Sequence, residues 1–435
     1  MSDITYIGFI DYRNKRTRFG IKQNDRSGHI YCIGKTGVGK STLLLRMAIS
    51  DIENGNGIGI IDPHGDLSET LLDYIPESRI KDVIYFNATD REFPMAFNPL
   101  QNVEAANHYL VASAIISTFK KAWSESWGPR LEHILRNTIL TLLQYPGANL
   151  LDIQPLLTDV NFRNEVLLNI SDTVILSFWY KEFYAMSPAL KAEAISPIIN
   201  KIGLFQTHPL IRNIVSQKTS SFCIADVMNH KKIFIANLSK GALGEEGTQL
   251  LGSLLVTQFQ TAAVGRTSQP LETRTPFYLY IDEMHSFVTL SFADILAESR
   301  KYGLSLFLTH QYIDQLHEKI LAAILGNVGT LICFRIGASD AKVLEQEFKP
   351  ILTSEDLVRL PRYGIYIKLL IDGTTSQPFS ANTISLIEGI KNFKAKIIDH
   401  NRSKYCQERI DITKERLQPS SKNEDEHNKF PLTLF

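Results

Sequence analysis

Short apolar runs alternate with amphipathic stretches along much of the chain. The first runs occupy residues 29–34, 57–61 and 82–86, and later ones occupy 231–238, 277–282, 304–310, 329–336 and 363–371. Segments of helical periodicity, such as 41–52 and 246–264, lie between them. Apolar runs of this length, separated by helices, are typical of parallel strands that are covered on both faces. The pattern therefore predicts an α/β fold with a mostly parallel central sheet.

The alternation stops in the middle of the chain. Apolar residues there recur at helical spacing, as in AANHYLVASAIISTFKKAW and PRLEHILRNTILTLLQY, and strand-like runs are nearly absent. We expect an all-helical inserted domain at 100–226, between a first α/β part at 28–99 and a second α/β part at 227–400.

Two flanking segments differ from the rest. Residues 1–27 are short and basic, with an expected strand from Tyr6 to Ile10, and they are interpreted as a solvated hairpin or a nucleic-acid or phosphate contact. Residues 401–435 are polar and charged, a composition that predicts a flexible tail.

Composition limits the classes of function. The chain has 435 residues, with 46 Lys+Arg against 46 Asp+Glu, so its formal net charge is zero. This balance argues against a polybasic protein that binds nucleic acid through bulk charge, although it leaves room for a local basic groove. Hydrophobic residues at 44% and charged residues at 21% are ordinary for a globular protein.

The cysteines and the apolar runs indicate the compartment. Cys32, Cys223, Cys333 and Cys406 are far apart and form no metal-binding spacing, so a disulfide scaffold and a structural zinc site are not expected. No apolar run is long enough to span a bilayer, and the first residues do not form a signal peptide. We expect a cytoplasmic protein without membrane insertion.

The strongest motif follows the apolar run at 29–34. It has the form G-x-x-x-x-G-K-[ST] and consists of Gly34, Lys35, Thr36, Gly37, Val38, Gly39, Lys40 and Ser41, followed by Thr42. Glycines let backbone N–H groups turn toward a phosphate, and the next helix directs its positive end to the same anion. Lys40 is expected to reach the β- and γ-phosphates of a nucleotide, and the Ser41 hydroxyl to bind Mg²⁺.

A second motif, FYLYIDE, ends an apolar run at 277–282. It delivers Asp282 and Glu283 to the carboxyl end of a predicted strand, where ligands sit in open α/β sheets. Asp282 is expected to hold Mg²⁺, directly or through water, and Glu283 to act as general base on the attacking water.

Further polar residues stand near these strands. Gln311 follows the apolar run at 304–310 and is predicted to sense the γ-phosphate and the lytic water. Arg300 precedes the same run and is predicted to act as an arginine finger on a neighbouring subunit, with Arg335 as its rival. The alternative for all three is an ordinary solvent-facing side chain.

Other candidates carry weaker signals. Asp62 and His64, in DPHGD, are candidates for orienting water or acting as a base, but a turn formed by Pro63 and Gly65 explains the motif better. Trp123 and Trp127 lie near Lys120, Lys121 and Arg130 and could stack on bases, although packing inside a helical domain is the more common role.

Together these motifs resemble those of the HerA/FtsK class of RecA-like motor ATPases, most closely the cytosolic part of the type IV secretion coupling proteins of the TraG/TraD group. The resemblance rests on IGKTGVGKSTLL, IDPHGDL, YIDEMHSF and ESRKYGLSLFLTHQ, within residues 28–98 and 228–372. It implies a RecA-like P-loop NTPase fold, Mg²⁺ and ATP as ligands, Lys40 and Ser41 as nucleotide and Mg²⁺ ligands, and Asp282 and Glu283 as Walker B. It also implies Gln311 as sensor, Arg300 as the finger, and a hexameric ring that moves DNA.

The sequence departs from that group in its first residues. Coupling proteins usually begin with a membrane anchor and HerA proteins with a β-barrel domain, and neither pattern is expected in residues 1–27. The sequence thus predicts an ATP-driven DNA translocase, with a relaxase, a secretion channel or a nuclease as partner. The alternatives are a nucleotide-gated regulatory ATPase whose helical insertion binds a protein, a HerA-like motor bound to a partner such as a nuclease, and a motor that moves a protein rather than DNA.

Overall fold

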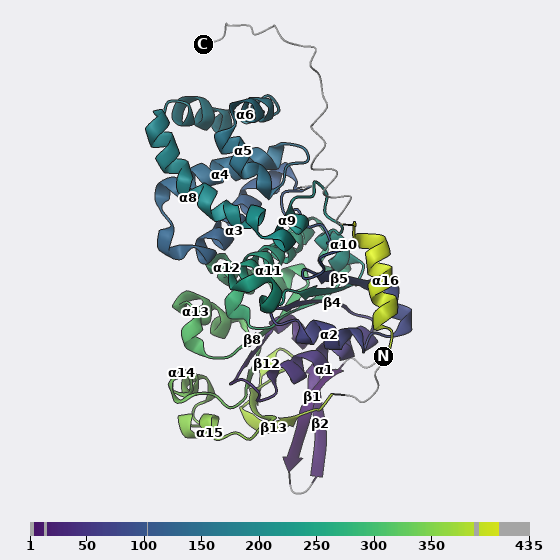
Figure 1. The fold of residues 1–435 in the computed structure, drawn as a ribbon. Helices are drawn as coiled ribbons and strands as arrows, with labels where there is room; N and C mark the ends of the chain where they lie inside the picture. Colours follow the sequence, from purple (N-terminus) through teal and green to yellow (C-terminus); the bar gives the residue numbers. More distant parts are fainter. Residues whose placement is uncertain (1–3, 13–14, 102, 387–390, 409–435) are drawn as a thin grey trace.

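The computed structural model describes residues 4–12, 15–101, 103–386 and 391–408. Within these ranges the chain forms an eleven-stranded sheet in the order β2-β1-β13-β10-β9-β3-β8-β7-β4-β6-β5 (Figure 1). The strands from β9 to β5 in this order all run parallel. The predicted α/β class with a mostly parallel sheet is therefore confirmed. The parallel strands are β3 (Ile30–Ile33), β4 (Gly57–Asp62), β5 (Val83–Asn87), β6 (Ile233–Asn237), β7 (Phe277–Ile281), β8 (Leu304–His310) and β9 (Thr330–Cys333).

Antiparallel strands extend the sheet beyond β9. The extension contains β1 (Ile4–Tyr12), β2 (Lys15–Lys22), β10 (Gly364–Lys368) and β13 (Phe379–Thr383). A small separate hairpin pairs β11 (Leu370–Ile371) with β12 (Thr374–Thr375), so the apolar run at 363–371 forms two strands rather than one. The basic N-terminal segment is a hairpin, as one interpretation held, but β1 pairs with β13 and thus joins the main sheet.

Both faces of the parallel part of the sheet are buried, and alternate residues show why. In β3, Ile30 and Cys32 belong to one apolar cluster, whereas Tyr31 and Ile33 belong to another. Because successive side chains of a strand point to opposite faces, a run that is apolar throughout needs a cover on each side. One cover consists of α1 (Lys40–Glu53), α2 (Asp66–Leu72) and α16 (Lys394–Tyr405). The other includes α11 (Lys240–Gly265), α12 (Leu290–Glu298), α13 (Glu318–Asn327), α14 (Ala338–Phe348) and α15 (Ser354–Val358).

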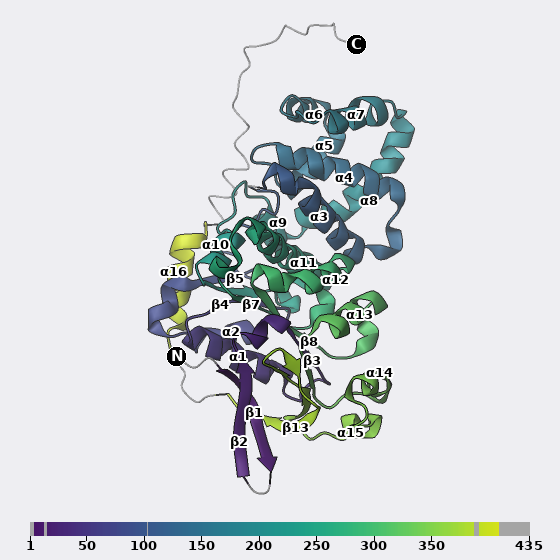
Figure 2. The same ribbon diagram turned by 180° about the vertical axis from the view of Figure 1, so that it is seen from behind.

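Helices occupy the chain between β5 and β6, where the described residues contain no strand. They are α3 (His108–Ala122), α4 (Pro129–Gln144), α5 (Ile153–Thr158), α6 (Val160–Leu167), α7 (Thr173–Ser177), α8 (Pro188–Thr207), α9 (Pro209–Val215) and α10 (Ile224–Asn229). Figure 2 shows α3 to α8 stacked on the side of α11 and α12 that faces away from the sheet. Their apolar residues continue the cluster that covers the sheet, so the division into domains at 100 and 226 stays a prediction.

Two boundaries differ from the sequence-based expectation. The helix expected at 246–264 begins earlier, because α11 starts at Lys240 and continues past a non-helical Gly244. The chain also stays packed beyond residue 401, where we expected a flexible tail. Asn401 is 2% exposed, and its Oδ1 accepts a hydrogen bond from the Tyr85 N–H at 2.7 Å. Residues 409–435 of the predicted tail lie outside the described residues.

Candidate active site at the carboxyl edge of the sheet

The G-x-x-x-x-G-K-[ST] motif forms the loop between β3 and α1. Gly37 and Gly39 have φ angles of +76° and +123°, which only glycine adopts without strain. Gly39 is the residue immediately before α1. A Cβ at Gly39 would lie 2.7 Å from Cδ1 of Tyr363. The Lys40 ammonium is folded onto the loop, where it donates to the carbonyls of Gly34 (2.6 Å) and Lys35 (3.1 Å). The loop therefore encloses the Lys40 ammonium, and it precedes the N-terminus of a helix, where backbone N–H groups can bind phosphate.

Strand β7 lies two strands from β3 and presents both acidic residues at its carboxyl end. Asp282 is 3% exposed and accepts a hydrogen bond from the Thr309 hydroxyl. Burial raises the pKa of Asp282 to about 6, and the nearby Glu283 and Asp62 carboxylates act in the same direction. Glu283 has a left-handed backbone (φ +47°), and its N–H donates to the Thr309 hydroxyl at 3.1 Å. Thr309, on β8, thus fixes both acidic residues.

Gln311 joins the two motifs. Its amide nitrogen donates to Oε1 of Glu283 at 2.7 Å, and its amide oxygen accepts from the Thr36 hydroxyl at 3.2 Å. The other carboxylate oxygen of Glu283, Oε2, is buried without a hydrogen-bond partner among the described residues. One side chain therefore links the phosphate loop to a carboxylate that keeps one oxygen available as an acceptor.

A cavity of about 200 Å³ lies between these groups. It is lined by the loop residues Thr36, Gly37, Gly39, Lys40, Ser41 and Thr42, and by His64, Asp282, Glu283, Gln311, Arg362 and Tyr363. Sequence analysis missed Arg362 and Tyr363. They precede β10, more than three hundred residues after the loop, and the Tyr363 N–H donates to the Val38 carbonyl at 2.9 Å. Nothing in the local sequence of LPRYG indicates this long-range contact.

The two candidate finger residues lie at opposite edges of the sheet. Arg300 is exposed on the short helix Ser299–Tyr302 that precedes β8, whereas Gln311 follows β8. Because that seven-residue strand rises about 3.3 Å per residue, about 20 Å separates Arg300 from the cavity of its own chain. Arg335 follows β9 instead, and its carbonyl accepts the Lys35 N–H at 2.9 Å. Arg335 is therefore next to the loop of its own chain.

Other sequence candidates have structural roles in the fold. The Asp62 carboxylate accepts from the N–H groups of His64 (2.9 Å) and Ser68 (2.8 Å), so it stabilises the turn before α2, while His64 lines the cavity. Trp123 and Trp127 are half-buried, and their indole N–H groups donate to Glu246 and Glu132, respectively. These tryptophans are packed among the helices.

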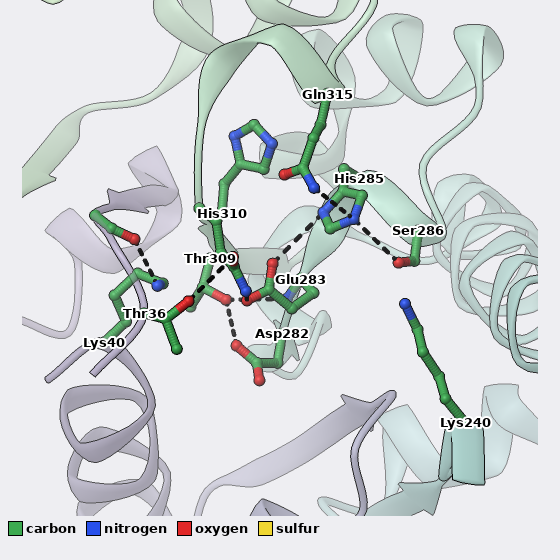
Figure 3. Close-up of polar contacts among 12 residues, drawn as sticks. Thr36, Lys40, Lys240, Asp282, Glu283, His285, Ser286, Thr309, His310 and Gln315 are labelled. Atoms are coloured by element: carbon green, nitrogen blue, oxygen red, sulfur yellow. Dashed lines mark hydrogen bonds and ion pairs between the residues drawn. The ribbon is translucent and has the colours of Figure 1, made fainter. Parts of the chain in front are cut away.

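Two histidines that sequence analysis did not single out stand behind the acidic pair (Figure 3). Nδ1 of His285 lies 3.5 Å from Oε2 of Glu283, and its Nε2 lies 3.3 Å from the Gln315 amide nitrogen. Burial lowers the pKa of His285 to about 4 and that of His310 to about 3. Both rings are therefore neutral near pH 7, and the contact between His285 and Glu283 is not an ion pair. DEMH and LTHQ place these histidines beside the motifs, which is the signal that could have found them.

Few protein oxygen atoms near the phosphate loop could bind Mg²⁺. No cluster of three or more acidic, His or Cys ligands occurs in the part of the chain that the structure describes. Mg²⁺ in phosphate-transfer sites does not need one, because it binds through one or two protein oxygens, water and the phosphates of the substrate. Ser41 and Asp282 both line the cavity and offer such oxygens. The residues therefore fit a cation that arrives with a nucleotide.

A glycine-rich loop between a strand and a helix, a buried lysine and an acidic pair at the carboxyl edge of a parallel sheet define a P-loop NTPase fold. The family model for the type IV secretion-system coupling protein DNA-binding domain matches residues 17–348. The chain therefore belongs to this family, in agreement with the resemblance seen in its motifs. Among curated proteins, none matches the sequence significantly.

Solved structures show the same fold at low identity. The bacterial conjugative coupling protein TrwBdeltaN70, unbound, has a TM-score of 0.63 and 14% identity over 86% of this chain and 88% of that chain. TrwB in complex with ADP and Mg²⁺ has a TM-score of 0.61 and 14% identity, with coverages of 86% and 90%. VirB4 of Thermoanaerobacter pseudethanolicus has a TM-score of 0.58 and 14% identity over 91% and 99%. In the described residues of this chain, no helix has the length and hydrophobicity needed to cross a bilayer.

Proposed function

We propose that this protein is a Mg²⁺-dependent ATPase that moves DNA as a ring of identical subunits in the cytoplasm. The observation that carries the proposal is the bridge formed by Gln311 between Thr36 of the phosphate loop and the Glu283 carboxylate. A buried carboxylate beside a phosphate-binding loop can act as general base on the water that attacks a terminal phosphate. Structures of TrwB with ADP and Mg²⁺ and with an ATP analogue support the choice of ligands.

Each residue at the carboxyl edge has a role in this proposal. Lys40 leaves the carbonyls of Gly34 and Lys35 and binds the phosphates, while the loop N–H groups hold them in place. Ser41 and Asp282 would hold Mg²⁺, which offsets the negative charge of the phosphates when bound. Glu283 accepts a proton from the attacking water through its unpaired Oε2, and Gln311 orients that water.

Arg300 completes the site in trans. It lies about 20 Å from its own cavity, across the length of β8, so it serves a cavity only in a neighbouring copy. An interface in which one edge of a subunit meets the other edge of the next is head-to-tail, and such contacts close into a ring where the rotation between subunits allows it. We infer a hexamer from the resemblance to ring-forming motors, with Arg335 as the alternative finger in cis.

DNA is the proposed cargo because the family model describes a DNA-binding domain over residues 17–348. The formal net charge of zero argues that the basic contacts are confined to a channel rather than spread over the surface. Binding through backbone phosphates is nearly independent of sequence and weakens as salt rises. A relaxase, a secretion channel or a nuclease are the partners consistent with such a motor.

The test is steady-state ATP hydrolysis by the purified protein, with and without single- and double-stranded DNA, at several salt concentrations. The proposal predicts Mg²⁺-dependent ATP turnover that at least one of the two forms of DNA stimulates at low salt. It also predicts that Glu283→Gln abolishes this turnover without loss of nucleotide affinity. Turnover that is indifferent to DNA would contradict the translocase and favour the second candidate, a nucleotide-gated regulatory ATPase whose helical insertion binds a protein.

A further inference from the structure

A lysine of the helical segment reaches into the turn that follows the acidic pair. Lys121, near the end of α3, donates from Nζ to the carbonyls of His285 (2.6 Å) and Val288 (2.7 Å). These carbonyls belong to the turn 284–288, which begins directly after Glu283. The turn is short and internally bonded, since the N–H groups of Phe287 and Val288 both donate to the Met284 carbonyl.

The environment of Lys121 is unusual for a lysine. Burial lowers the pKa of its ammonium from 10.5 to about 7, and no acidic partner offsets that cost. The Lys121 side chain is half-buried, and two carbonyl contacts take the place of part of the water that its ammonium loses. The adjacent Lys120 behaves in the ordinary way, because it is exposed and approaches Glu132 at the surface.

The turn transmits position to the catalytic carboxylate. Met284, Phe287 and Val288 are at most 2% exposed and pack into the apolar cluster that also contains residues of α3. On its other side the turn carries His285, whose ring lies against Oε2 of Glu283 (Figure 3). A shift of α3 would therefore be passed through the carbonyls that Lys121 holds to the ring that contacts Glu283.

We propose that Lys121 is a positioning residue through which the helical insertion sets the orientation of Glu283. The inference deepens the proposed function and rests on it, since Glu283 is taken as the base for ATP hydrolysis. Lys121 is not among the residues that line the cavity. Its effect should therefore fall on the rate of hydrolysis and not on nucleotide affinity.

The experiment compares Lys121→Met with Lys120→Met. Both remove one positive charge from α3 and keep most of the apolar stem. Basal ATPase activity without DNA gives kcat and KM, and a fluorescent ATP analogue with Mg²⁺ gives the nucleotide Kd. We expect Lys121→Met to lower kcat roughly 10- to 100-fold, as for a misplaced catalytic group, with the Kd changed less than about twofold. Lys120→Met should retain the wild-type kcat.

Thermal unfolding of each variant separates positioning from a merely structural role. A Lys121→Met protein that melts earlier but keeps the wild-type kcat per folded molecule would overturn the proposal. If Lys121→Met does not fold, Lys121→Gln replaces it, with Lys120→Gln as control and the same criterion. A wild-type protein without ATPase activity would instead defeat the proposed function itself.

A double-mutant cycle tests the route through the turn. His285→Gln removes the ring that faces Glu283, and it is combined with Lys121→Met. If both act through one turn, the double variant should lose little more kcat than the more impaired single variant. Losses in kcat that multiply independently would contradict the route.

Discussion

The two edges of the parallel sheet carry different parts of the proposed machine. The carboxyl edge brings together Lys40, Asp282, Glu283 and Gln311 in one cavity, with direct contacts between loop, sensor and carboxylate. The amino edge carries Arg300 on a short helix, exposed and about 20 Å from that cavity. The difference implies that a single copy holds most of the proposed site at one edge and the candidate finger residue at the other.

The contrast also separates what one subunit does from what an assembly does. Under the proposed function, nucleotide binding should depend on the carboxyl edge alone, because the phosphate loop and the acidic pair come from one chain. Full turnover should depend on both edges, because the transition state needs a positive charge that Arg300 cannot supply to its own cavity. Substitutions at the two edges should therefore have distinguishable effects on binding and on rate.

The largest effect is expected from Lys40→Ala at the carboxyl edge. Removing the cation of the phosphate cradle should reduce both nucleotide binding and hydrolysis, with turnover falling to background. Equilibrium binding of a fluorescent ATP analogue and steady-state hydrolysis measure the two losses. Unchanged affinity in this variant would show that the nucleotide binds elsewhere.

A large effect on rate alone is expected from Arg300→Ala at the amino edge. Nucleotide affinity should stay within about twofold, while kcat falls by roughly 10³-fold, the lower end for a lost arginine finger. Arg335→Ala is the matched variant at the carboxyl edge, and it should keep most of its kcat. The opposite ranking of these two variants would assign the finger to Arg335.

The smallest effect is expected on folding stability, through Lys121, whose ammonium binds the turn that follows Glu283. The pKa of this ammonium, about 7, lies below the ordinary 10.5, so between these values the unfolded chain binds the proton more tightly than the folded protein does. The free energy of unfolding of the wild type should therefore rise by about 1–2 kcal/mol, relative to that of Lys121→Met, as the pH increases from 7 to 9. Urea unfolding of both proteins at the two pH values checks the direction. A constant difference would show that the ammonium is not buried.

Local patterns predicted much of this molecule. The cradle could be predicted because strand, loop and helix are consecutive in sequence, and the acidic pair because FYLYIDE marks the end of a buried strand. The parallel sheet followed from runs that are apolar at every position, which two covering layers require.

Contacts between distant segments could not be predicted. Tyr363 closes the cavity through a hydrogen bond to Val38, and β1 joins the sheet through β13, a partner almost four hundred residues away. Lys121 looks like its neighbour Lys120 in sequence, and only the packing of α3 against the turn 284–288 distinguishes the two. Periodicity assigns elements, but it does not specify which element lies against which.

The most direct test of the shared site is a mixing experiment. Glu283→Gln and Arg300→Ala proteins are each assayed for ATP hydrolysis with DNA, and then combined in equal amounts under the same conditions. Each variant alone should be nearly inactive. The mixture should regain part of the wild-type rate, because an interface with an intact cavity from one variant and an intact finger from the other can form. A mixture no more active than its components, in assemblies shown to exchange subunits, would contradict a site completed by the neighbouring copy.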